Sequence, residues 1–393
     1  MRAGAFLAAA IMTATAAGAS VADPVLERRL ARYLAGGWDP LTAPVEWYDS
    51  VDPIPGAARE PARGAPVRLA PEALAAALAH AEADGATALL VAESGRLVAE
   101  RYWGGTTAET RLNPQSMAKT VVALLVGVAI DRGEIGSADD PVGRHVAAWR
   151  DDPRGRITLA QLLQMASGLG QVDAGRGWAM TPDNPAVRQY FGSDFDAPML
   201  ALPLVARPGE RFDYNNNATK LVARALEEAS GLSYARLVSE RLWKPLGLAD
   251  ASVYVDRPGG RPMASCCLFS RPRDWLGVGR LIAGRGEVDG SRIVSAAWVD
   301  RMLAPSPANP GYGFQIWVGD QKVGGERLPP VLTPWQSERF AARDLVLLNG
   351  FGGQRVWIMP SADLVVVRMG RTWPKAWDDA AIPNLLHRSL RTP

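Results

Sequence analysis

The residues best placed to do chemistry in this sequence are a serine and a lysine three positions apart, in Ser116-Met117-Ala118-Lys119. The run from 116 to 130 is apolar and free of proline, which predicts a buried helix. Residues at i and i+3 share one helix face, so the Lys119 amine can reach the Ser116 hydroxyl. The positive end of the helix dipole would also favour a developing alkoxide there. The pair therefore predicts a nucleophilic serine that gives its proton to lysine instead of histidine.

A purely structural interpretation of this pair stays open, because S-x-x-K is common by chance in a long chain. In that interpretation Ser116 caps a helix and Lys119 reaches solvent one turn later. The apolar run that follows Lys119, Thr120-Val-Val-Ala-Leu-Leu-Val126, favours the chemical interpretation. A lysine buried in such a run needs a polar partner.

A second group of candidate residues follows the turn at Pro208-Gly209, in Tyr214-Asn215-Asn216. Tyr214 offers a phenol for proton transfer, and Asn216 an amide that can hold a substrate carbonyl. A phenol with a pKa of about 10 is a poor base at neutral pH. A neighbouring Lys119 cation would lower that pKa, so the two residues make chemical sense together. Taken alone, the stretch is equally an asparagine cap beside a half-buried tyrosine.

Other common catalytic signatures are absent from the sequence. It contains no G-x-S-x-G, no Walker A motif, and no G-x-G-x-x-G between a strand and a helix. The three histidines, His80, His145 and His387, are far apart and belong to no HExxH motif. With no CxxC motif either, a dedicated zinc site is not expected.

Taken together, the order and spacing of these motifs resemble the serine β-lactamase and penicillin-binding-protein superfamily. Residues 157–169, ITLAQLLQMASGL, are similar to the family segment ITxxxLLxHTSGL, and residues 271–290 are similar to its TARDLARFG…NGG segment. The resemblance covers roughly residues 80–390. It implies a nucleophilic Ser116, with Lys119 and Tyr214 sharing the proton transfers and Asn216 contacting a substrate amide. It also implies that no metal or organic cofactor is needed.

One departure from the family pattern narrows the expected substrates. β-Lactamases and cell-wall peptidases carry K-T-G or H-T-G on the strand beside the site, and neither occurs here. The corresponding region reads Leu348-Asn-Gly-Phe-Gly-Gly-Gln354, which resembles the 6-aminohexanoate-dimer hydrolase and esterase-like branch. Gly352, Gly353 and Gln354 are accordingly expected to line the substrate site. A strand N–H there and that of Ser116 would form the oxyanion hole. A bulge or a tight strand entry explains the two glycines equally well.

The surrounding elements predict an α+β fold. A helix is expected from Pro71 to Ala83 and a hairpin of largely buried strands over residues 87–99. Helices are also expected near Thr158 and over residues 217–229, within a mostly helical insertion of about 131–260. Strands return at 312–318, 345–348, 355–359 and 364–369, before a last helix at about 377–390. Because short turns join the late strands, these must be antiparallel, and the sheet is assembled from both chain ends.

The first 22 residues are typical of a secretory signal peptide, with Arg2, an uncharged Ala-rich run and small residues up to Ala22. Cleavage after Ala22 would give a periplasmic or secreted protein without stable membrane insertion. Residues 23–70, rich in proline and tryptophan, are expected to be an irregular segment wrapped over the main domain of 71–393. An uncleaved anchor is the alternative, but the run is short.

Composition limits the classes of partner and the use of cysteine. The 393 residues carry 43 Lys and Arg against 41 Asp and Glu, a net charge of +2, so nucleic acid and anionic membranes are not expected partners. The two cysteines, Cys266 and Cys267, are adjacent, and we expect buried free thiols. A disulfide between them would need an unusually strained ring.

The sequence thus predicts an exported serine hydrolase that cleaves a small amide or ester through an acyl-enzyme on Ser116. Two alternatives remain. The first is a D-amino-acid peptidase or β-lactamase, which export favours and the missing K-T-G opposes. The second is a non-catalytic ligand-binding or sensor module on the same fold, for which a complete set of Ser116, Lys119 and Tyr214 has no evident use.

Overall fold

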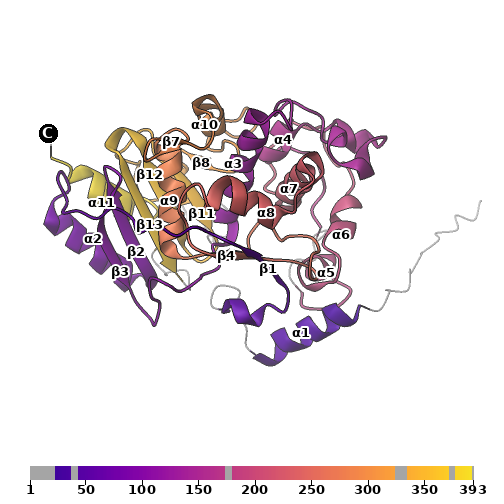
Figure 1. Cartoon of the computed structure of the whole chain (residues 1–393), viewed down its shortest axis with the longest axis horizontal. Coiled ribbons are helices and arrows are strands. Elements are labelled where there is room, and N and C mark those ends of the chain that lie inside the picture. Colours follow the sequence, from indigo (N-terminus) through magenta and orange to yellow (C-terminus); the bar gives the residue numbers. More distant parts are fainter. Residues whose placement is uncertain (1–22, 37–42, 173–178, 324–333, 371–376, 392–393) are drawn as a thin grey trace, which may run out of the picture.

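A six-stranded antiparallel sheet forms one side of the molecule in the computed structural model, which describes residues 23–36, 43–172, 179–323, 334–370 and 377–391 (Figure 1). The expected signal peptide, residues 1–22, lies outside the described residues. The strand order is β3-β2-β13-β12-β11-β8. The strands are β2 (Ala86–Glu93), β3 (Arg96–Tyr102), β8 (Trp317–Val318), β11 (Val346–Gly350), β12 (Gln354–Met359) and β13 (Leu364–Gly370).

This sheet joins the two ends of the chain, which confirms the predicted α+β architecture. The early strand β2 pairs with the last strand β13, with Val91 opposite Val366. Strand β2 is buried along its whole length, as a continuous apolar run predicts. Strand β3 differs from the prediction, because most of its residues are only half-buried at the sheet edge. The strand expected over 312–318 is also shorter, since only Trp317 and Val318 pair with β11.

Two helices pack on this sheet, and a third packs on one of them. α2 (Pro71–Ala83), which has the predicted bounds, packs on β2 and on α11 (Ala381–Arg388). α9 (Pro272–Ala283) packs on β12 and β13 and lies in front of the sheet in Figure 1. Gly279 allows this close approach, because a Cβ at this position would collide with the side chains of Val365 and Val356.

The other half of the molecule is the helical part predicted from the middle of the sequence, drawn at the right of Figure 1. The apolar helix α3 (Ala118–Asp131) leads into it and is buried along nearly its whole length. Thr158 begins α4 with a capping box, in which its hydroxyl accepts from the Gln161 N–H. The helices are α4 (Leu159–Leu163), α5 (Pro185–Phe191), α6 (Asp196–Leu200), α7 (Asn216–Ser230), α8 (Tyr234–Val238) and a π-helical turn (Ser239–Trp243).

The segment expected to be irregular differs from the prediction, because it contains a helix and a strand. α1 (Pro24–Gly36) buries Leu26 and Leu30 against α5, and β1 (Val51–Ile54) pairs with β4 (Ala251–Tyr254) in a second small sheet that also includes β5 (Leu268–Phe269). We expected an irregular segment because of its many prolines. Pro53 is nevertheless tolerated within β1, because β1 is an edge strand of that sheet. Because β4 begins at Ala251, the helical part also ends before residue 260.

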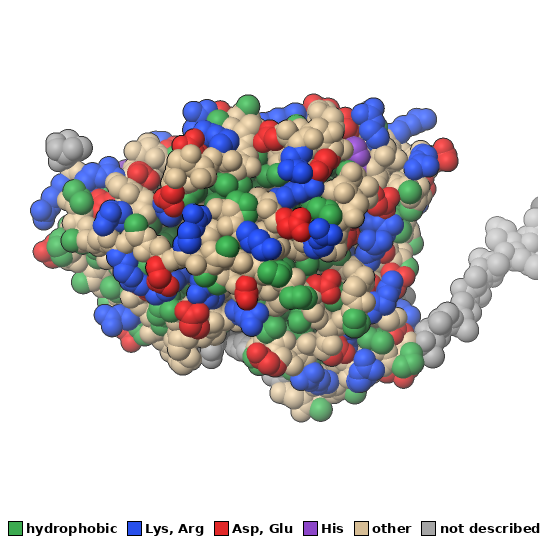
Figure 2. All heavy atoms as spheres, in the orientation of Figure 1, with side chains coloured by type: hydrophobic (Ala, Val, Ile, Leu, Met, Phe, Trp, Pro, Cys, Tyr) green, Lys and Arg blue, Asp and Glu red, His purple; other side chains and the backbone are tan. Residues whose placement is uncertain are grey.

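The remaining elements are short and are not part of the six-stranded sheet. They are β6 (Glu287–Val288), β7 (Ser291–Arg292), α10 (Ala296–Leu303), β9 (Lys322–Val323) and β10 (Trp335–Gln336). On the face shown in Figure 2, basic and acidic side chains are interspersed. Within the described residues, no helix is long and apolar enough to cross a membrane.

Candidate active site

Ser116 lies where a short 3-10 turn, Gln115–Met117, runs into the buried helix α3. The turn packs against the end of β11, so the serine sits between the helical half and the sheet. Gln115, directly before the serine, has a φ of 52°, an unfavourable conformation for a residue with a side chain. The buried Asn113 side chain supports it, because its Oδ1 accepts a 2.9 Å hydrogen bond from the Gln115 N–H.

Lys119 is one turn further along α3 and does not reach solvent. Its side chain is 1% exposed, and its Nζ donates a 2.8 Å hydrogen bond to Ser116 Oγ and another of 2.8 Å to the Ser265 carbonyl. The interpretation in which Lys119 extends into water is therefore wrong. The i, i+3 spacing produces the contact that the sequence predicted.

The surroundings of Lys119 favour its neutral amine. Burial lowers the pKa of Lys119 to about 7, because desolvation penalises the ammonium. None of the ion pairs found among the described residues includes Lys119, so no carboxylate offsets this effect. At neutral pH a large share of the amine is free to accept a proton from Ser116.

Tyr214 is held over this pair by aromatic neighbours. Its ring stacks on Trp317 of β8 at 6.1 Å between centroids, and the edge of Tyr312 meets it at 6.2 Å. Lys119 Nζ lies 5.0 Å from the centroid of the Tyr214 ring. Asn215, the next residue, caps α7 and donates a 3.0 Å hydrogen bond to the Gly170 carbonyl, which fixes the loop that carries the tyrosine.

The pKa of Tyr214 shifts in the direction opposite to the one expected from the sequence. Burial raises it to about 12, and a hydrogen bond with Ser116 opposes the rise. The expectation assumed a lysine cation beside the phenol, whereas burial leaves Lys119 only partly protonated at neutral pH. Lys119 is thus suited to act as a base and Tyr214 as an acid, because burial lowers the lysine pKa below that of the tyrosine.

Asn216 is the first residue of α7, two positions after Tyr214, and it is exposed. That position keeps it free for a substrate contact, which remains a prediction. The preceding Asn215, by contrast, is buried and structural, with its side-chain oxygen accepting from the Asn217 N–H at 3.0 Å.

The glycines expected beside the substrate form the turn between β11 and β12. Gly352 and Gly353 have φ values of 79° and 77°, so the tight-turn explanation applies to them. Gln354 is buried, and its amide group pairs with both the N–H and the carbonyl of Gly370, so its side chain holds the end of β13, and its role as a substrate contact stays a prediction. The residue that meets the serine loop is Gly350, where a Cβ would collide with the Pro114 carbonyl oxygen.

Two buried arginines hold this turn in place. Arg355 donates a 3.0 Å hydrogen bond to the Gly350 carbonyl and pairs with Asp379, which is also buried. Arg368 donates a 2.8 Å hydrogen bond to the Gly353 carbonyl. Sequence analysis missed Gly350 and both arginines, although Arg355 directly follows the glycine-rich motif.

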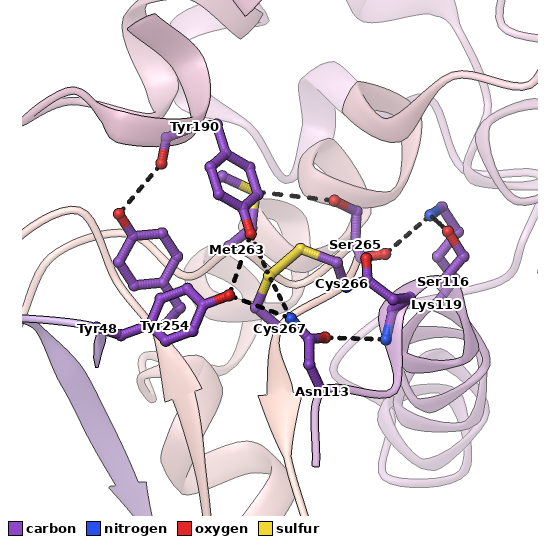
Figure 3. Close-up of a disulfide and its surroundings, with 11 residues drawn as sticks. Tyr48, Asn113, Ser116, Lys119, Tyr190, Tyr254, Met263, Ser265, Cys266 and Cys267 are labelled. Atoms are coloured by element: carbon purple, nitrogen blue, oxygen red, sulfur yellow. Dashed lines mark hydrogen bonds between the residues drawn. A yellow bond between two sulfur atoms is a disulfide. The ribbon is translucent and has the colours of Figure 1, made fainter. Parts of the chain in front are cut away.

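The cysteines differ from the prediction of free thiols, since Cys266 and Cys267 form a disulfide. The bond follows directly after Ser265, whose carbonyl accepts from Lys119 (Figure 3). The sequence offered no signal for this contact, because 146 positions separate Ser265 from Lys119. Within the described ranges, no three His, Cys, Asp or Glu side chains are placed together to hold a metal ion.

Comparison with known proteins agrees with this geometry. A family model described as beta-lactamase matches residues 73–388. The 6-aminohexanoate-dimer hydrolase of Paenarthrobacter ureafaciens is 27% identical over 301 residues, which cover 73% of this chain and 72% of that protein. The D-alanyl-D-alanine-carboxypeptidase/endopeptidase AmpH of Escherichia coli is 28% identical over 193 residues, 44% of this chain and 47% of AmpH.

A solved structure of another protein shares the fold over most of this chain. EstCE1, a hydrolase with promiscuous acyltransferase activity, superposes with a TM-score of 0.60 at 17% identity, covering 81% of this chain and 97% of EstCE1. The family match spans the serine, the lysine, the tyrosine and the sheet that supports them. The chain therefore belongs to the beta-lactamase family and is a serine hydrolase.

Proposed function

We propose that the protein hydrolyses small amides or esters through an acyl-enzyme on Ser116. The observation that carries this proposal is the contact between Lys119 Nζ and Ser116 Oγ at 2.8 Å, with the lysine pKa lowered to about 7 by burial. A neutral amine at hydrogen-bond distance is positioned to take the serine proton. No carboxylate or histidine is needed in this arrangement.

In the acylation half, Ser116 Oγ attacks the substrate carbonyl while Lys119 takes its proton. Tyr214, protonated because its pKa is raised to about 12, then gives its proton to the leaving amine or alkoxide. The Lys119 ammonium restores the phenol, so both groups return to their starting states. Water cleaves the acyl-enzyme through the same proton path in reverse.

The oxyanion of the tetrahedral intermediate is proposed to lie between the Ser116 N–H and the end of β11. The first N–H groups of a helix have no partner within the helix, so that of Ser116 is available. Gly350 brings the strand directly against the serine loop, and Arg355 fixes the Gly350 carbonyl by a 3.0 Å hydrogen bond. The carbonyl itself only accepts, so the second donor would be a backbone N–H of this part of the chain, and a donor held in place stabilises the developing charge without reorganising.

The relatives and the missing K-T-G motif support an amide or ester without a required carboxylate. One relative is named for a 6-aminohexanoate dimer, and a neighbour in fold is a hydrolase with acyltransferase activity. A D-amino-acid peptidase is the second candidate, supported by the similarity to AmpH. β-Lactam hydrolysis is the least supported activity, since it relies on the cation that K-T-G supplies.

A comparison of substrates tests this proposal. We expect turnover of p-nitrophenyl butyrate or of an ω-aminoacyl amide dimer, with kcat/KM at least about 100-fold above that for benzylpenicillin or nitrocefin, since lost recognition of this kind costs several kcal/mol. Preferential release of D-alanine from a D-alanyl-D-alanine peptide would support the peptidase instead. Absence of turnover on all of these, with folded protein, would favour the binding module.

The pH dependence of acylation tests the role of Lys119. Because only the neutral amine accepts a proton, we expect kcat/KM for an ester to fall about tenfold per pH unit below a midpoint near pH 7. Above that midpoint the rate should level off, since Tyr214 keeps its proton up to a pKa of about 12. Measurement of kcat/KM from pH 5 to 9 checks this, and a flat profile would contradict it.

A further inference from the structure

The disulfide between Cys266 and Cys267 lies beside the groups that hold the Ser116–Lys119 pair (Figure 3). These are the only cysteines of the chain. Cys267 is completely buried among aromatic side chains, whereas Cys266 is half-buried. Two separate paths of contact lead from the bond to the candidate catalytic residues.

The first path runs along the backbone. The Ser265 carbonyl belongs to the peptide group that joins Ser265 to Cys266, and it accepts the 2.8 Å hydrogen bond from Lys119 Nζ. A bond between adjacent cysteines closes a small ring through a single peptide group, which restricts the backbone on both sides. The Ser265–Cys266 peptide group is attached to this ring at the Cys266 Cα, so a change of the ring moves the point from which the Ser265 carbonyl is held.

The second path runs through Asn113. Its Nδ2 lies 3.8 Å from Cys267 Sγ and donates a 3.3 Å hydrogen bond to the Tyr48 hydroxyl. Its Oδ1 accepts from the N–H of Gln115, the residue that precedes Ser116 and has a φ of 52°. Figure 3 shows the Asn113 side chain between the disulfide and this loop. Asn113 thus links Cys267 to the residue that directly precedes the nucleophile.

Reduction must move atoms in this pocket. Two bonded sulfurs that become thiols separate by about 1.5 Å to reach nonbonded contact. Each thiol also carries a hydrogen, whereas a disulfide sulfur only accepts. Cys267 is fully buried, with Tyr190 OH 3.5 Å and Asn113 Nδ2 3.8 Å from its Sγ, so a displaced sulfur would press on these groups.

We propose that the Cys266–Cys267 disulfide is a redox-sensitive positioning element of the active site, which orients the Ser265 carbonyl and Asn113 and thereby the Ser116–Lys119 pair. The oxidised form is the active one. This inference rests on the proposed function, because it presumes that Ser116 and Lys119 carry the reaction.

The redox step requires a dithiol reductant. A thiolate of the reductant attacks the half-buried Cys266 sulfur, breaks the bond to Cys267, and forms a mixed disulfide. The second thiol of the reductant then displaces Cys266 and closes the oxidised reagent. The protein gains two electrons and two protons as two thiols, and the dithiol loses the same.

The test compares the full chain before and after dithiothreitol, with alkylation and intact-protein mass spectrometry reporting the thiols. The second-order rate of Ser116 labelling by a fluorophosphonate should fall about tenfold on reduction, since a misplacement of about 1 Å costs up to 100-fold. kcat for p-nitrophenyl butyrate should fall similarly, with the thermal midpoint within a few degrees. Reoxidation should restore both rates.

A variant without the disulfide provides the matched control. In the double variant Cys266→Ser/Cys267→Ser, Ser116 should be labelled at the slow rate of the reduced protein. Dithiothreitol should not change that rate. Asn113→Ala should also slow labelling, and Asn113→Asp, which keeps the acceptor for the Gln115 N–H, should recover most of the rate.

The outcomes separate this inference from the proposed function. Absence of labelling in the oxidised wild type would overturn the proposed function. Equal labelling of oxidised and reduced protein, two free thiols in the fully active protein, or a loss that only follows unfolding would overturn the inference alone.

Discussion

Replacing Ser116 by alanine is expected to abolish acyl-enzyme formation and to lower kcat by at least about four orders of magnitude, as loss of a nucleophile does in other serine hydrolases. The fold should not change, because the hydroxyl contributes only its hydrogen bonds with Lys119, at 2.8 Å, and with Tyr214. No neighbouring serine can substitute for it, since the attacking oxygen must lie beside both Lys119 and the oxyanion donors.

Intact-protein mass spectrometry after treatment with a fluorophosphonate measures this directly. Wild type should gain one adduct, and Ser116→Ala none. Ser270→Ala is a control for loss of a serine hydroxyl, because the Ser270 hydroxyl is buried and has no hydrogen-bond partner within the described residues. That variant should keep the adduct and the full rate. An unchanged adduct in Ser116→Ala would place the nucleophile elsewhere and end the proposed mechanism.

Replacing Tyr214 by phenylalanine is expected to lower kcat by about two to four orders of magnitude, the range for a lost general acid–base group. The ring and its stacking on Trp317 remain, so the structural cost should be small. The effect should be larger for amides than for p-nitrophenyl esters, because an amine leaves only when protonated whereas nitrophenolate leaves unaided.

Tyr312→Phe is the control for this variant. Tyr312 is buried and its ring edge meets Tyr214, but its hydroxyl is not part of the proposed proton path. It should retain activity within about threefold of wild type, as expected for a group outside the transition state. Near-full amide turnover by Tyr214→Phe would show that Lys119 protonates the leaving group without the phenol.

These two variants also separate the roles of base and acid. If Lys119 alone removes the serine proton, Tyr214→Phe should keep the dependence of acylation on a group with a pKa of about 7. The residual esterase activity of Tyr214→Phe provides that measurement. Proteins that share a fold differ in substrate because the residues of their sites differ. The relatives therefore indicate the class of reaction better than they indicate the substrate.

The sequence by itself determined the family and the outline of the fold. The spacing of Ser116 and Lys119 on an apolar helix predicted their contact, because i and i+3 share a face whatever surrounds them. The apolar strands at both chain ends predicted an antiparallel sheet, since short turns between the late strands allow no other pairing. The export signal stays a prediction.

Only the tertiary structure decided the protonation states and the supporting contacts. Burial lowers the pKa of Lys119 and raises that of Tyr214, and burial depends on distant segments such as the one that carries Trp317. The contacts of Ser265 with Lys119 and of Gly350 with the serine loop join positions with no common local pattern, and the Cys266–Cys267 disulfide was not expected from the sequence. Local spacing determines which side chains share a helix face, whereas desolvation and long-range contacts exist only once the chain has packed.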